Sequence, residues 1–123
     1  MKGLAIGQTA SDTRTFTEQD LAEYVALAGV HKSAQSDIVP GPLLGAMFSC
    51  LLGTRLPGRG TNWLKQRFAF PAPAYVGEEI TATVEIIRLR PEKDLVNLHT
   101  VCANPAGVIV CEGEALVLVK DLE

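Results

Sequence analysis

The residues best suited to proton transfer lie in one polar, loop-like segment, Gly29–Asp37. His31 could serve as a general base near neutral pH. Asp37 could orient the His31 imidazole or accept a proton itself, and the order of the two along the chain does not matter if the geometry is right. The alternative interpretation is that both side chains are exposed loop residues. Their role depends on the element that follows them.

That element is a helix predicted over Pro42–Leu52. The stretch contains no charged residue, and a helix that is apolar on every side is expected to be buried. It is too short to span a bilayer. Pro42 suits the first turn of a helix and Gly53 suits its end. We therefore expect a domain folded around one buried central helix, with the polar segment near the N-terminus of that helix.

The spacing of the apolar residues changes along the chain from a helical to a strand-like period. An amphipathic helix is predicted over Thr15–Leu27, opened by a capping-box pattern at Thr17 and Asp20. Met1–Arg14 is expected to be an extended lead-in. Alternating sequence then predicts four strands: Asn62–Phe70, Ile80–Leu89, Leu95–Ala103 and Val108–Val119.

Consecutive strands with tight turns favour an antiparallel sheet, and helices followed by strands are typical of an α+β fold. We expect a single domain over residues 1–123. Within the first strand, alternation would place Trp63, Lys65 and Arg67 on the face opposite to Gln66 and Phe68.

Composition limits the classes of function. The chain has 123 residues, 47% hydrophobic residues, 20% charged residues and a formal net charge of −3, which is ordinary for a globular domain. The mild acidity argues against nucleic acid as the main partner. The segment from Arg55 to Lys93, however, contains seven basic residues and only four acidic ones. This surplus is either a solvated face or a local phosphate-binding patch.

The three cysteines, Cys50, Cys102 and Cys111, have no motif spacing and are expected to be small buried hydrophobic residues. A reducing cytoplasm is the simplest compartment for them. The sequence shows no signal peptide and no apolar run of membrane-spanning length, so no membrane association is expected. With two histidines and three scattered cysteines, no metal site is expected, and we expect no cofactor.

Four stretches resemble the MaoC-like family of hot-dog-fold proteins, and in particular its (R)-specific enoyl-CoA hydratases. FTEQDLAEYVALAG is similar to the family's first helix, and IVPGPLLGAMFSCLLG is similar to its IVHG-(apolar)-FSxLLG helix. LPGRGTNWLKQRFAFPAPAYVGEEITATVEI resembles the family's LPG-x-G segment followed by F-x-x-P-x-x-x-GDE and a strand. GEALV resembles the closing strand. The resemblance covers residues 16–119.

The resemblance implies a hot-dog fold, in which a curved antiparallel sheet wraps a long apolar helix. It implies a homodimer, or a hetero-oligomer with a second hot-dog chain, that binds an acyl-CoA or acyl-carrier-protein thioester. The acyl chain would enter a tunnel beside the central helix. The nucleotide would lie along the surface, where Arg59 and Lys65 are either phosphate ligands or ordinary solvated charges.

Two residues near this helix match the family's substrate-binding positions. Gly41 aligns with the glycine whose backbone N–H supports the thioester oxygen, which gains negative charge as the enolate forms. Amides at a helix N-terminus suit that role because the helix dipole and the free N–H groups point the same way, and Pro42 has no N–H to offer. Ser49 aligns with the family's supporting serine, or its hydroxyl bonds back to its own helix.

The family's catalytic pair has no match. Active members carry Asp-x-Asn-Pro-x-His ahead of the helix, whereas this chain has GVHKSAQSD at Gly29–Asp37, in a shorter segment. The histidine of IVHG is replaced by Pro40. His31 and Asp37 are therefore substitute candidates for the base that activates water.

Three functions remain open on the sequence. The first is an acyl-CoA hydratase or dehydratase that uses a rearranged base. The second is a non-catalytic or partner subunit of a hetero-oligomeric hot-dog dehydratase. The third is an acyl-CoA thioesterase, for which Asp37 and Ser49 are the available groups. His99 has a role in none of them, because it points away from the helix if Leu98 and Thr100 face it.

Overall fold

The computed structural model describes residues 3–28 and 37–123. Its elements are β1 (Thr9–Thr15), α1 (Glu18–Ala28), α2 (Gly41–Thr54), β2 (Asn62–Ala69), β3 (Glu79–Arg90), β4 (Leu95–Ala103) and β5 (Ile109–Leu118), with a short 3-10 turn at Pro91–Lys93. Within these described ranges, no helix is long and apolar enough to cross a membrane.

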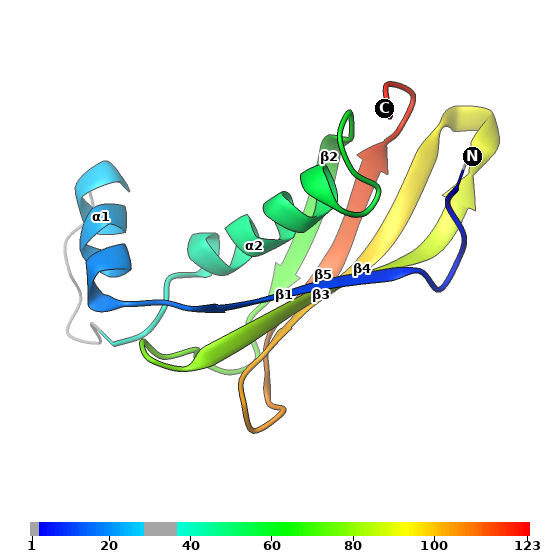
Figure 1. Cartoon of the computed structure of the whole chain (residues 1–123). Coiled ribbons are helices and arrows are strands. Elements are labelled where there is room, and N and C mark those ends of the chain that lie inside the picture. The colour runs from blue at the N-terminus through cyan, green and yellow to red at the C-terminus, as the bar shows by residue number, and fades with distance from the viewer. Residues whose placement is uncertain (1–2, 29–36) are drawn as a thin grey trace.

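The strands form one antiparallel sheet in the order β1-β3-β4-β5-β2. The sheet is curved, α2 lies along one of its faces, and α1 stands apart at one end (Figure 1). The predicted α+β arrangement and antiparallel sheet are confirmed. The four strands predicted from alternation correspond to β2–β5, and each boundary agrees to within one residue.

The core lies between α2 and the sheet, because alternate strand residues point at the helix. In β3 these residues are Ile80, Ala82, Val84 and Ile86, and none of them has exposed surface. Phe48 of α2 is equally buried. Full burial of each large apolar side chain contributes roughly 1.5–3 kcal/mol to stability, so contact with the sheet fixes the position of α2.

The segment expected to be an extended lead-in contains a strand, β1, which pairs with β3 along its whole length. Hydroxyl groups join the two strands: Ser11 with Thr83 at 2.9 Å and Thr13 with Thr81 at 3.0 Å. TASDTRT has no apolar alternation, so its periodicity does not indicate a strand. Pairing at the sheet edge, rather than burial of a face, forms this strand.

The capping box predicted at the start of α1 is confirmed. Thr17 Oγ1 accepts a hydrogen bond from the Asp20 N–H at 3.1 Å, and Asp20 Oδ2 accepts one from the Thr17 N–H at 2.8 Å. The bond from the Thr17 N–H is the main reason that the pKa of Asp20 is lowered, and Arg14 contributes. Phe16 and Leu21, on either side of the cap, are both buried, in agreement with a hydrophobic staple.

Helix α2 is buried on one side only, which corrects the expectation of a helix buried all round. Its buried residues are Leu44, Gly45, Met47, Phe48, Leu51 and Leu52. Its exposed residues are Pro42, Ala46, Ser49, Cys50 and Thr54. The sheet of one chain covers one side of the helix, and the other side is uncharged although it faces outward. A surface helix normally carries charge there, so this side has the composition of a contact surface.

The cysteines divide into two groups. Cys102 and Cys111 lie opposite each other on β4 and β5 as buried free thiols. Burial raises the pKa of Cys102 to about 12 and that of Cys111 to about 11. Both therefore stay protonated at neutral pH and act as small hydrophobic residues, as expected. The expectation of burial is wrong for Cys50, because Cys50 lies on the outward side of α2.

Candidate functional site

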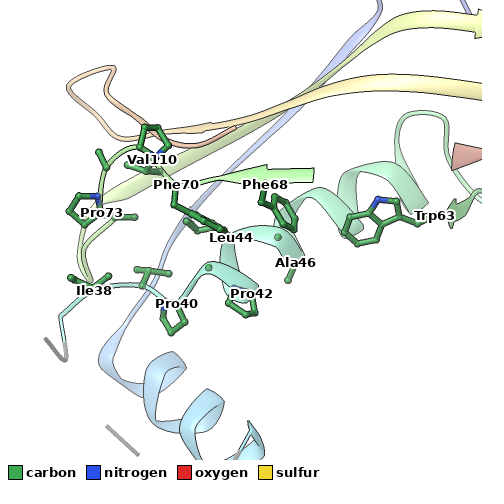
Figure 2. A pocket seen from close by; sticks show the side chains of 16 residues that line it. Ile38, Pro40, Pro42, Leu44, Ala46, Trp63, Phe68, Phe70, Pro73 and Val110 are labelled. Carbon is green, nitrogen blue, oxygen red and sulfur yellow. The ribbon is translucent and has the colours of Figure 1, made fainter. Parts of the chain in front are cut away.

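A groove of about 950 Å³ opens where α2 begins. One wall is formed by Ile38–Pro40 and the first turns of α2, and the other by β2 and the loop Phe70–Ala74. Figure 2 shows the side chains of 16 lining residues, which extend from Ile38 and Pro73 at one end to Trp63 at the other. None of these described lining residues has an ionisable side chain, so the groove is suited to a hydrocarbon chain.

Two glycines allow the walls of the groove to meet closely. A Cβ at Gly41 would lie 2.7 Å from Cζ of Phe70, and a Cβ at Gly45 would lie 3.1 Å from Cζ of Phe68. The two rings therefore rest against the bare backbone of α2. The Phe68 ring is also stacked on Phe48, with centroids 6.0 Å apart, and lies 5.8 Å from the Phe70 ring. The result is a row of aromatic rings between β2 and α2.

Gly41 is the first residue of α2 and lines the groove. Within the described residues, no side chain caps this helix, since the N-cap is Pro40 and Pro42 follows Gly41. The Leu43 N–H donates to the Pro40 carbonyl at 3.0 Å. For the Gly41 N–H, no acceptor is recorded in the part of the chain that the structure describes. This amide is therefore the donor that the N-terminus of α2 can offer to a ligand.

Asp37, one of the candidate bases, is exposed and directly precedes Ile38, the first lining residue of the groove along the chain. Its carbonyl accepts a hydrogen bond from the Val76 N–H at 2.8 Å. The next residue, Ile38, forms a bridge with Tyr75 and lines the groove. These backbone contacts hold the chain in place directly before α2. The second candidate base, His31, lies outside the described residues.

The other predicted site residues do not line the groove. Ser49 is exposed on α2, and Lys65 is exposed on β2. Arg59 is exposed in the turn after α2, where its carbonyl accepts a hydrogen bond from the Glu123 N–H at 3.0 Å. Of the predicted site residues that the structure describes, Gly41 alone lines the groove, and Ser49, Arg59 and Lys65 lie elsewhere on the surface.

His99 points away from α2, as expected. Its neighbours Leu98 and Thr100 have no exposed surface, whereas His99 Nε2 lies at the outer face of the sheet, 3.7 Å from Glu112 Oε2. No group of three or more His, Cys, Asp or Glu side chains that could hold a metal ion occurs within the described ranges.

Strand β2 contains a feature of the groove that alternation did not predict. A bulge between Trp63 and Lys65 shifts the register, so that Trp63 lies opposite Val117 and Gln66 lies opposite Ala115. Val117 and Ala115 are both fully buried under α2. The expectation that Trp63 shares a face with Lys65 is therefore wrong: the extra residue of the bulge turns Trp63 to the face that carries Gln66.

Comparisons with known proteins agree with this geometry. The chain is 34% identical over 128 residues to an (R)-specific enoyl-CoA hydratase from Aeromonas caviae, a match that covers 94% of this chain and 96% of that protein. It is 37% identical over 125 residues to an (R)-specific enoyl-CoA hydratase from Rhodospirillum rubrum, covering 92% of this chain and 86% of that protein. No family model matches the sequence.

Solved structures confirm the hot-dog fold. An (R)-hydratase from A. caviae superposes with a TM-score of 0.88 at 34% identity, over 96% of this chain and 98% of that chain. A MaoC-like dehydratase from Rhodospirillum rubrum shares the fold with a TM-score of 0.77 at 18% identity, over 95% of this chain and 93% of that one.

Proposed function

Because the chain belongs to the family of the (R)-specific enoyl-CoA hydratases, within the MaoC-like hot-dog proteins, we propose that it binds an acyl-CoA or acyl-carrier-protein thioester and interconverts its enoyl and (R)-3-hydroxyacyl forms. The observation that carries the proposal is an apolar groove that is lined by Gly41, the first residue of α2. The groove receives the acyl chain, and the amide receives the thioester oxygen.

Hydration of an enoyl thioester requires a fixed donor and a base. The oxygen of water bonds to the β-carbon while a base takes one of its protons, and the α-carbon then receives a proton from that base. Between these steps the thioester oxygen carries negative charge. The Gly41 N–H, at the positive end of α2, is the donor that stabilises this charge.

The base is assigned to the segment that leads into α2, since none of the described lining residues can accept a proton from water. Asp37 directly precedes Ile38, which lines the groove. His31 belongs to the same segment but lies outside the described residues. The thioesterase alternative has less support, because Ser49, one of its two candidate groups, does not line the groove.

Hydration of crotonyl-CoA tests the proposal. Purified protein is expected to remove the absorbance of the enoyl thioester, and to restore it when supplied with (R)-3-hydroxybutyryl-CoA. The matched control is (S)-3-hydroxybutyryl-CoA, which is expected to stay unchanged. Release of free thiol from these substrates would instead support a thioesterase. A protein that binds acyl-CoA but catalyses neither reaction would contradict the hydratase proposal.

The absence of an ionisable side chain among the described lining residues also favours a second candidate, a non-catalytic subunit of a hetero-oligomeric dehydratase. In that case the groove binds the acyl chain and a second hot-dog chain supplies the base. The chain alone would then be inactive on crotonyl-CoA, and activity would appear when the second hot-dog chain is added.

We also propose a homodimer joined at β2. This strand is at the end of the sheet order, so one side of its backbone has no strand partner among the described residues, and its own residues are exposed on both faces. An exposed apolar edge is a template for pairing with another chain. Sedimentation in an analytical ultracentrifuge is expected to give the mass of two chains. A single-chain mass at micromolar concentration would contradict the dimer.

A cytoplasmic location is part of the same proposal. Its support is that all three cysteines are free thiols, which persist most simply in a reducing compartment.

A further inference from the structure

We infer that Trp63 closes the far end of the groove and sets the longest acyl chain that the protein accepts. The inference rests on the proposed function, because it takes the acyl chain to run along the groove from Gly41. The indole of Trp63 forms the end wall of the groove, and the side chain of Gln66 holds the indole in position.

The position of Trp63 supports a role at the end of the groove. Trp63 is one of the lining residues. Figure 2 shows it at the end opposite to Pro40, with Ala46 of α2 between them. A helix rises about 1.5 Å per residue, so Gly41 and Ala46 are separated by about 7.5 Å along α2. A butyryl group held at the Gly41 amide is shorter than this span, and an octanoyl group is longer.

Hydrogen bonds fix the Trp63 indole to the core. Trp63 Nε1 donates to Gln66 Oε1 at 3.2 Å, and Gln66 Nε2 donates to Thr100 Oγ1 at 3.1 Å. Gln66 Nε2 also donates to the Arg67 carbonyl at 2.8 Å. Gln66 thus uses both ends of its amide, one toward the groove and one toward the sheet.

Thr100 is the inner end of this chain of bonds. It has no exposed surface, and among the described residues it is the single polar residue that is buried. A buried hydroxyl without a partner is costly, so the Gln66 amide is held at Thr100. The Trp63 indole is held in turn, although 39% of its surface is exposed. A side chain that is anchored in this way resists displacement by a long acyl chain.

The fluorescence of Trp63 provides a direct test, since Trp63 is the single tryptophan of the protein. The probes are butyryl-, hexanoyl-, octanoyl- and decanoyl-CoA, which have no double bond to hydrate, with CoA as the control. Binding of each is measured separately by calorimetry. The emission is expected to stay constant with butyryl-CoA and CoA, and to change with octanoyl- and decanoyl-CoA.

Variants provide a second test. In Trp63→Ala the ratio of kcat/KM for octenoyl-CoA to that for crotonyl-CoA is expected to rise about tenfold or more. Gln66→Leu, which frees the indole, is expected to raise the ratio by a smaller factor. The matched control is Ile87→Ala on β3, which removes an apolar side chain of similar exposure outside the groove and is expected to leave the ratio unchanged.

The outcomes are distinguishable. Equal emission changes with butyryl- and decanoyl-CoA, or constant emission while calorimetry shows that decanoyl-CoA binds, would overturn the role of Trp63 and leave the proposed function intact. So would an unchanged length ratio in Trp63→Ala. Because Trp63 lies on β2, the proposed dimer edge, all ligand titrations are made at one protein concentration, so that dissociation of the dimer does not contribute to the emission change. Failure of every acyl-CoA to bind in calorimetry would overturn the proposed function and this inference together.

Discussion

Gly113→Ala is expected to lower the free energy of unfolding by about 3 kcal/mol or more. Gly113 lies on β5 opposite Phe68 of β2, and a Cβ at this position would overlap the carbonyl oxygen of Arg67 and approach Gln66 Nε2 to 3.3 Å. The Arg67 carbonyl is backbone, so it cannot rotate away as a side chain can. The substitution therefore has to push β2 away from β5.

Urea unfolding followed by circular dichroism measures this effect. The matched control is Gly53→Ala in the last turns of α2, where a Cβ would meet nothing within 4 Å. Because alanine is the better helix former, the control is expected to stabilise the protein by up to about 0.5–1 kcal/mol. A loss below about 1 kcal/mol for Gly113→Ala would show that β2 and β5 are not packed as closely as described.

The same substitution affects the groove. Gln66 and Phe68 move with β2, and Gln66 holds the Trp63 indole. We therefore expect the tryptophan emission of folded Gly113→Ala to shift to longer wavelength, as the indole loses its fixed position. Stability and groove geometry are linked here because the strand that closes the sheet is also a wall of the groove.

The sequence predicted the sheet well because β3, β4 and β5 each bury one face. Burial of one face requires apolar and polar residues to alternate along the strand. Every strand boundary predicted from this alternation is within one residue of the observed one. It fails for β1, whose pairing with β3 buries no apolar face. It also fails inside β2, where the bulge at Trp63 changes the face of a side chain without changing the sequence pattern.

The site was predictable to different degrees for similar reasons. Gly41 could be identified by resemblance and by its place before Pro42. Gly45 was missed, although glycines four residues apart on a helix, followed by a strand with Phe68 and Phe70, are a signal of close helix–strand packing. The Trp63–Gln66 bond could not be foreseen, since it depends on the bulge.

Removal of the general base is expected to reduce catalysis more than any other substitution proposed here. We expect His31→Ala or Asp37→Asn to lower kcat for crotonyl-CoA hydration by about 10²–10⁴-fold, which is the usual contribution of a general base. The reason is that the described lining of the groove offers no ionisable side chain. The proton of the attacking water therefore has to pass to a group in the segment before α2.

The chain offers a matched control for each substitution. His99→Ala removes its other histidine, which lies at the outer face of the sheet, and Asp12→Asn makes the same chemical change in an exposed strand residue. Both are expected to keep the parent rate. The pH profile of kcat/KM then separates the two candidates: a rise with a midpoint near the ordinary histidine value of about 6.5 would assign the base to His31.

If neither substitution changes the rate of an active protein, the base does not come from this segment of the chain. A residue of a second copy of the chain, outside this segment, would then have to supply it, because the Gly41 amide can stabilise the enolate but cannot accept a proton from water. Activity that depends on protein concentration, in a chain whose His31→Ala and Asp37→Asn variants are both fully active, would support that result. The position of the base thus decides between a site completed within one chain and a site completed by a second copy.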